Sequence, residues 1–202
     1  MILKRLRYET ADQHAAMESQ LPLLDPAMPM SRYRNLLAKF YGYYSPLEDR
    51  LRATKLWTDS GYDWVARVKS PSLEADLLVL GEFPSLLPRC ENLPVLTTLP
   101  QVLGCLYVME GATLGGQIIT KHLQANLGLT RDSGAEFFSG YGDQTRQRWQ
   151  EFGILLTDTA ELLDQNDAIV DSANATFKTL GDWLALGAAI SPNPLVEIGA
   201  AI

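Results

Sequence analysis

The chain has 202 residues, of which 47% are hydrophobic and 20% are charged, and its formal net charge is -7. This length suits a single domain with a sizeable core, and the composition is ordinary for a soluble globular protein. The negative charge argues against general nucleic-acid binding, so an anionic ligand would need a local basic patch. No run approaches the 18 or more apolar residues of a membrane span, which predicts a cytoplasmic protein that does not bind a membrane.

The two cysteines, Cys90 and Cys105, occur without a CxxC motif. Two isolated cysteines indicate neither a disulfide framework nor a structural zinc site. Both are therefore interpreted as reduced residues that pack in the core.

The first predicted element is an amphipathic helix over residues 3–21, with His14 in the middle of its apolar face. Prolines at positions 22, 26 and 29 then interrupt the chain. Ser31 can cap a second helix that reaches Leu51 and bends at Pro46. Its apolar stripe consists of Tyr33, Leu36, Leu37, Phe40, Tyr44, Leu47 and Leu51.

Residues 57–69 are predicted to form a loop with a short helix, after which Ser70 can act as an N-cap and Pro71 as the first helical residue. The segment from Pro84 to Pro100 contains four prolines and is interpreted as a connector, because apolar residues are spread through it. A helix rich in glycine follows.

That helix runs from Pro100 beyond Ile119, and its four glycines each cost roughly 1 kcal/mol relative to alanine. Three of them, Gly104, Gly111 and Gly115, fall on one face, which leaves a strip of bare backbone. The simple interpretation is a close helix crossing. Four glycines in thirteen residues favour instead a hinged helix that lies over a ligand.

A glycine-rich loop is predicted at 128–142, followed by a helix capped by Asp143 and a last helix over about 167–186. No strand pattern and no internal repeat is apparent. The sequence therefore predicts an all-α, single-domain bundle of six to eight helices, some of them bent, over residues 1–190, with a weakly specified tail at 191–202.

Only two histidines, His14 and His122, are present. A lone histidine on an apolar helix face is usually a packed core residue, but Glu18 follows His14 by one turn and can fix its tautomer, as carboxylates do for metal-bound histidines. Arg7 lies about 10 Å earlier along the same predicted helix, a distance that suits a contact with the carboxylate edge of a large planar cofactor. His122 is interpreted as a surface residue.

The sequence lacks the phosphate-binding, dinucleotide-binding, nucleophile-elbow and zinc-protease motifs. It also lacks an ExxH pair, so a di-iron carboxylate bundle would lack its ligands. What the residues indicate is one buried histidine, His14, which is the candidate metal ligand, together with a glycine-rich helix and a basic edge.

Several motifs resemble heme oxygenase, and the resemblance is stronger to the bacterial branch found beside bacteriophytochromes than to the mammalian enzymes. The motifs that carry it span most of the chain and are Leu6-Arg7-x-x-Thr10-x-x-x-His14-x-x-x-Glu18, Tyr44-x-Pro46-Leu47-Glu48, Leu106-Tyr107-Val108-x-Glu110-Gly111-x-x-Leu114-Gly115-Gly116, Phe137-Phe138-x-Gly140-Tyr141-Gly142 with Trp149 and Phe152, and Ala175-Thr176-Phe177. Their order and spacing together are more specific than any one of them.

The resemblance implies a heme-oxygenase-like fold and oxidation of bound heme to biliverdin, carbon monoxide and iron, with dioxygen and an external electron donor. It implies that His14 is the iron ligand, and that Gly111, Ala112 and Gly115 lie in the distal helix over the reacting face. Further implied heme contacts are Arg7, Glu18, Tyr141, Phe177 and Gly116. An electron-donor protein, and a bacteriophytochrome that accepts biliverdin, are the implied partners.

One residue departs from the mammalian pattern. Where those enzymes have an aspartate that organises water after the first distal glycine, this chain has Ala112. Small residues at this position occur in the bacterial branch, so the reading remains that of an enzyme whose protons follow another route.

Three alternatives stay open. A heme-storage or heme-delivery protein of the same fold is the main one, for which Ala112 is the best argument. A thiaminase-type relative would use Cys105 as its nucleophile, although no neighbouring motif activates this thiol. The third is a helical partner protein that binds no heme and uses its glycines for packing.

Overall fold

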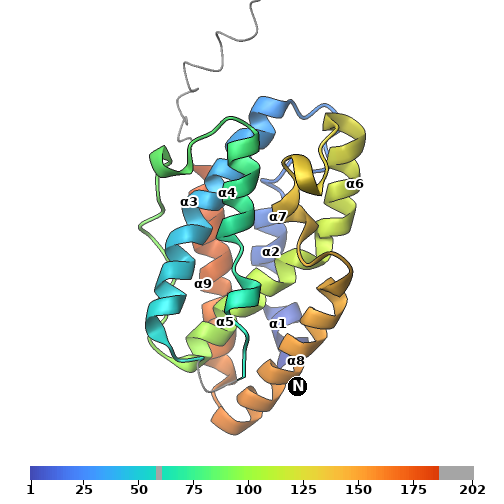
Figure 1. Ribbon diagram of the computed structural model, residues 1–202. Helices are drawn as coiled ribbons and strands as arrows, with labels where there is room; N and C mark the ends of the chain where they lie inside the picture. Colours follow the sequence, from blue (N-terminus) through green and yellow to red (C-terminus); the bar gives the residue numbers. More distant parts are fainter. Residues whose placement is uncertain (58–60, 187–202) are drawn as a thin grey trace, which may run out of the picture.

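The computed structural model describes residues 1–57 and 61–186, and within these ranges it is all-α and contains no strand (Figure 1). The predicted domain end at 190 and the tail 191–202 lie outside the described residues. The α-helices are α1 (Ile2–Glu9), α2 (Ala11–Glu18), α3 (Met30–Thr54), α4 (Ser70–Val79), α5 (Leu99–Gly111), α6 (Gly116–Leu127), α7 (Glu136–Ser139), α8 (Thr145–Leu163) and α9 (Asn166–Ala185). Short 3-10 helices are η2 (Val65–Arg67), η3 (Pro84–Leu86), η4 (Ala112–Gly115), η5 (Arg131–Ser133) and η6 (Gly142–Gln144).

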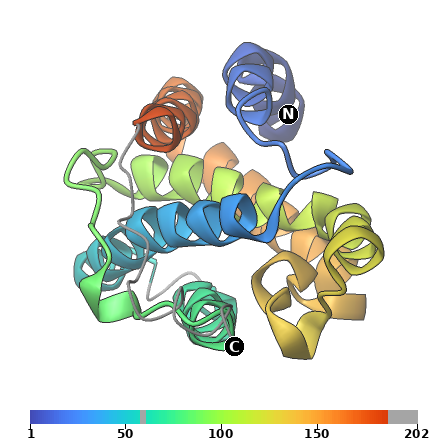
Figure 2. The ribbon, with the colours of Figure 1, turned by 90° about the horizontal axis from the view of Figure 1, so that it is seen from above.

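The long helices form layers around α5. In the view from above, α9 and the α1–α2 pair lie on one side of α5, and α4 and the segment containing α7 lie on the other (Figure 2). All seven residues of the predicted α3 stripe are buried, and Pro46 lies inside this helix as expected. The amphipathic patterns therefore predicted the core faces of α3 and α9 correctly, whereas Leu162 on the expected apolar face of α8 is exposed.

The predicted helix over residues 3–21 is divided in two. Thr10, with φ -107° and ψ 1°, separates α1 from α2, although backbone hydrogen bonds continue across it from Thr10 to Leu6 and from His14 to Thr10. The hydroxyl of Thr10 also donates to the Leu6 carbonyl at 2.7 Å, a bond that competes with straight helix geometry. Arg7 and His14 thus lie on different helices, and the distance estimated for one straight helix does not apply.

The glycine-rich helix is hinged, as the sequence indicated. It consists of α5, a 3-10 turn at Ala112–Gly115 and α6, and it crosses α9 closely. The whole stretch Leu99–Leu127 is long and apolar enough to cross a membrane, with a mean hydropathy of 1.4, but 56% of its apolar window is buried in the bundle. Its apolar character is that of a core helix.

Several predicted helix starts are wrong. Ser31 makes no capping bond, because α3 already begins at Met30 after Pro29, and Ser70 gives its hydroxyl to Glu48 instead of capping α4. Asp143 lies in η6, two residues before α8 begins. The predicted loop at 128–142 contains the short helix α7. Two predicted helices are each divided in two. For both reasons the described residues contain more α-helices than the six to eight expected.

Candidate heme site

His14 lies on α2 with two neighbours that match the sequence pattern. Its Nδ1 is 3.4 Å from Oε2 of Glu18, and its ring meets that of Phe177 edge-on, with the centroids 5.4 Å apart. The contact at Nδ1 leaves Nε2 as the nitrogen that could ligate a metal. The side chain is 49% exposed, so the expectation of a buried histidine is wrong. This imidazole is accessible to a ligand.

Phe177 comes from α9, which is far from α2 in the sequence but packs against it. Its side chain is buried and has 5% exposure, as do most residues on the core face of α9. The ring therefore contacts the His14 imidazole from the core side of α9, and α2 packs against α9. This contact joins the second and the last of the described α-helices.

The four glycines of the hinged helix divide into two pairs. A Cβ at Gly104 would collide with the Ile169 carbonyl, and one at Gly116 would collide with the Phe138 carbonyl. A Cβ at Gly111 or Gly115 would come no closer than 3.8 Å to any neighbour, at Trp149 and Ile119 respectively. Gly104 and Gly116 therefore permit helix packing, although the sequence pattern placed Gly104 on the ligand face and the resemblance placed Gly116 at the heme.

Gly111 directly precedes η4 and Gly115 ends it, and at both positions there is room for a Cβ without a clash. Gly111 is partly exposed, and Ala112 and Gly115 are exposed. The hydroxyl of Thr113 donates to the Glu110 carbonyl at 2.7 Å and stabilises the tighter turn. Backbone without side chains along one helical turn is what a flat ligand needs for close approach. The glycine pair 111 and 115 has this property.

The sequence analysis assigned no role to Tyr107 and Trp149, although both belong to the motifs that resemble heme oxygenase. Their rings are 5.8 Å apart, with Tyr107 on α5 and Trp149 on α8 next to Gly111. Burial raises the pKa of Tyr107, while a hydrogen bond with Thr10 and the charge of Arg7 act in the opposite direction. Tyr107 therefore lies near the junction of α1 and α2, and Arg7, an exposed residue, is close to it.

Tyr141 was expected at the carboxylate edge of heme. In the structure its hydroxyl donates instead to Oε1 of Glu110 at 2.7 Å. The physical reason is that Glu110 is 2% exposed, and a buried carboxylate requires donors. The segment that carries Tyr141 lies across α5 from the α1–α2 pair (Figure 2).

The other chemical candidates lose support from their surroundings. Cys90 and Cys105 are both buried and free, and burial raises the pKa of the Cys105 thiol to about 12. Such a thiol is a poor nucleophile, which argues against the thiaminase-type alternative. His122 is partly exposed and contacts Asn126, 2.8 Å from its Nε2. Among the described residues no group of three or more His, Cys, Asp and Glu side chains could hold a metal ion.

These residues fit heme. The accessible imidazole supplies the kind of axial donor that heme iron takes, the aromatic ring of Phe177 lies beside it, and the uncovered glycines leave room for a flat ring. The all-α fold thus carries an accessible imidazole on α2 and a hinged glycine helix, which are features that a heme protein can use.

Comparison with known proteins agrees. The heme oxygenase family matches residues 1–185 of the chain, and the chain therefore belongs to the heme oxygenase family. Heme degradation is its function at the level of the family. No curated protein matches the chain.

Solved structures with the same fold include three bacterial heme oxygenases. The enzyme from Neisseria meningitidis, solved with NO and CO bound, has a TM-score of 0.74 and 19% identity, and the match covers 94% of both chains. The enzyme from Leptospira interrogans has a TM-score of 0.74 and 21% identity, over 91% of this chain and 98% of that one. The enzyme from the cyanobacterium Synechocystis, solved in complex with heme, has a TM-score of 0.70 and 20% identity, over 98% and 96%.

Proposed function

We propose that this chain binds heme between His14 and the segment Gly111–Gly115 and cleaves it to biliverdin, carbon monoxide and iron. The observation that carries this assignment is the contrast within one helix: a Cβ at Gly104 or Gly116 would collide with a backbone carbonyl, whereas one at Gly111 or Gly115 would collide with nothing. Packing explains the first pair. A ligand explains the second, because an uncovered glycine otherwise only weakens a helix.

In this proposal His14 ligates the iron through Nε2, and Glu18 orients the ring through Nδ1. Arg7 contacts a propionate, and Phe177 lies against the macrocycle. Bound heme supplies the iron centre at which dioxygen reacts, and its own ring is the substrate. The backbone at Gly111 and Gly115 limits the space beside one edge of that ring and thereby favours one site of oxidation.

Ala112 offers no polar side-chain atom, so protons would reach the site through water held by backbone groups of η4. The electrons come from outside the chain, which makes a reductase or ferredoxin-like donor the partner in turnover, and a bacteriophytochrome is the proposed acceptor of biliverdin. The free thiols of Cys90 and Cys105 suit a reducing compartment, and we place the protein in the cytoplasm.

The first experiment replaces each histidine in turn and follows hemin binding by absorption. We expect His14→Ala to lose the spectrum of histidine-ligated heme and to lose turnover, because the described residues offer only His122 as another imidazole. His122→Ala is the matched control and should behave like the wild type. A His14→Ala protein with the wild-type Soret band and activity would overturn the assignment of the ligand.

The alternative of a heme-storage protein is favoured by one observation, the nonpolar Ala112. The two functions are separated by adding an electron donor and dioxygen to the heme complex. An enzyme bleaches the Soret band with the appearance of biliverdin, whereas a storage protein keeps its heme through repeated reduction and reoxidation.

A further inference from the structure

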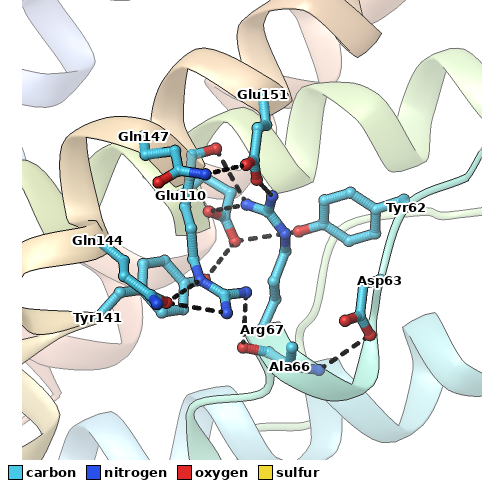
Figure 3. Close-up of polar contacts among 10 residues, drawn as sticks. Tyr62, Asp63, Ala66, Arg67, Glu110, Tyr141, Gln144, Gln147 and Glu151 are labelled. Carbon is cyan, nitrogen blue, oxygen red and sulfur yellow. Dashed lines mark hydrogen bonds and ion pairs between the residues drawn. The ribbon is translucent and has the colours of Figure 1, made fainter.

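A cluster of polar side chains surrounds Glu110, the residue directly before Gly111 (Figure 3). Oε1 of Glu110 accepts hydrogen bonds from the hydroxyls of Tyr62 at 3.0 Å and Tyr141 at 2.7 Å, and Oε2 accepts one from Nη1 of Arg67 at 2.9 Å. The three donors come from the segment before α4, from η2 and from the loop after α7. One buried carboxylate therefore joins three separate parts of the chain to the last turn of α5.

Arg67 extends the cluster to α8. Its Nη1 also donates to the Arg148 carbonyl at 3.1 Å, and its Nη2 donates to Oε2 of Glu151 at 3.1 Å. Arg67 is 6% exposed, whereas the Glu151 side chain is 50% exposed and borders a pocket of 410 Å³ that Tyr62 and Arg67 also line. The buried pair is thus held from the solvent side by a second carboxylate.

The cluster lies at the end of α5, directly before the hinge, and this position indicates its role. Regular α-helix ends at Gly111, and the 3-10 turn that follows contains Ala112 and Gly115, which offer no polar side-chain atom for anchoring. The Thr113 hydroxyl, as described above, bonds back to the carbonyl of Glu110. Glu110 is consequently the last side chain of α5 that is fixed in direction before the hinge.

The energetics favour a geometric role over a stabilising one. Apolar side chains of similar volume often replace a buried ion pair without loss of stability, because desolvation offsets the attraction between the charges. A carboxylate with three donors from different directions instead fixes one orientation. The cluster is therefore better explained by the need to place the hinge than by the need to hold the core.

We propose that Glu110, held by Arg67, Tyr62 and Tyr141, is a positioning residue that sets where the Gly111–Gly115 segment lies over the bound ring. The proposal rests on the proposed function for what this segment faces, but the placement of the segment is a property of the protein without heme. It does not require Glu110 to touch the substrate.

The first test follows backbone hydrogen exchange in the apoprotein, in peptides that cover residues 108–120. Glu110→Gln keeps the shape but removes the charge that pairs with Arg67, and we expect amides of the hinge to exchange about tenfold faster, since a buried ion pair has lost one partner. Glu48→Gln is the matched control. Glu48 is 1% exposed and accepts three hydrogen bonds, but its donors belong to Lys69 and Ser70 and none belongs to α5.

The second test uses the heme complex with azide as a probe of the space under the hinge. We expect Glu110→Gln to change azide affinity by about threefold or more and to yield a mixture of biliverdin isomers, while Glu48→Gln keeps the wild-type values. Tyr141→Phe removes a single donor and should give a smaller change in the same direction, which covers the case in which Glu110→Gln does not fold.

The outcomes separate the two proposals. If hinge exchange, azide affinity and isomer pattern all match the wild type while the unfolding midpoint falls, Glu110 acts in stability alone and the inference is wrong. If the wild type binds no heme, the proposed function fails, yet hydrogen exchange in the apoprotein still decides whether Glu110 places the hinge. Faster exchange in both Glu110→Gln and Glu48→Gln would also contradict a specific role.

Discussion

At the scale of single residues, Lys69 is a buried lysine beside the Glu110 cluster, and its burial disfavours the charged form of its amine. Lys69 is 6% exposed, and its Nζ lies 3.5 Å from the centroid of the Tyr141 ring and has no hydrogen-bond partner among the described residues. Burial lowers its pKa to about 8, even though the charges of Glu110 and Glu48 raise it. The folded protein therefore holds this proton less tightly than the unfolded chain.

The direction of the pH dependence follows from this difference. Between about pH 8 and the ordinary lysine pKa of 10.5 the unfolded chain binds more protons at Lys69 than the folded protein, so the free energy of unfolding gains from rising pH. We expect Lys69→Met to remove a gain on the order of 2 kcal/mol between pH 8 and 10. Denaturant unfolding of the apoprotein measures it.

Lys121→Met, at an exposed lysine, is the control for this measurement. Tyrosines of the unfolded chain begin to ionise near pH 10 and affect wild type and variants alike. The informative quantity is therefore the difference between each variant and the wild type. Parallel stability curves for wild type and Lys69→Met would show that the burial of Lys69 has no such cost.

At the scale of the element, the glycines of the hinged helix α5–η4–α6 fall into two groups: two permit close helix packing, and two are proposed to face the ligand. Gly104→Ala and Gly116→Ala should destabilise the apoprotein by about 1–3 kcal/mol, because each new methyl group meets a backbone carbonyl. Gly111→Ala and Gly115→Ala should leave stability unchanged or raise it by up to about 1 kcal/mol. Chemical unfolding of the four apoproteins tests both halves of this prediction.

The same glycines separate packing from chemistry once larger side chains are introduced. Leu at Gly111 or Gly115 should suppress biliverdin formation in single turnover while most of the fold persists, because the side chain enters the space over the ring. Lost stability with preserved chemistry in these two variants would contradict a distal role for the hinge.

At the scale of the whole molecule, the proposed site combines segments that are far apart in the sequence. Phe177 of α9 contacts His14 of α2, and in the proposal the hinge at Gly111–Gly115 lies on the other face of the heme. Bound heme should therefore contact both α2 and the hinge and stabilise both segments. A ligand at 100 times its Kd stabilises a protein by about 2.7 kcal/mol, which corresponds to a rise of about 5 °C or more in Tm.

Hydrogen exchange locates this stabilisation. Hemin should slow exchange in peptides of α2 and of residues 108–120, and Ser70–Val79 in α4 provides the internal control, because α4 lies on the other side of α5 (Figure 2). Equal protection of all three regions would indicate global stabilisation without a local site, and protection of α4 alone would place the ligand elsewhere.

The sequence by itself determined the fold class and the core faces of α3 and α9, and it singled out His14 as the candidate ligand. Helical periodicity depends on local spacing, so the apolar stripes of α3 and α9 could be predicted from the sequence. Because the chain has only two histidines, there were few candidates for a metal ligand. The density of glycines indicated the hinge for the same reason, since its cost is a local property.

Only the tertiary structure decided what each glycine faces. Gly104 and Gly111 are equivalent in spacing, but a Cβ at Gly104 would collide with the backbone of α9, whereas one at Gly111 would make only an ordinary contact with Trp149. The difference depends on neighbours that are remote in the sequence. The partner of Tyr141 was also decided by the tertiary structure, because its hydroxyl donates to the buried carboxylate of Glu110. Helix starts and the break at Thr10 also escaped prediction, since they depend on bonds that compete with the helix pattern rather than on the pattern itself.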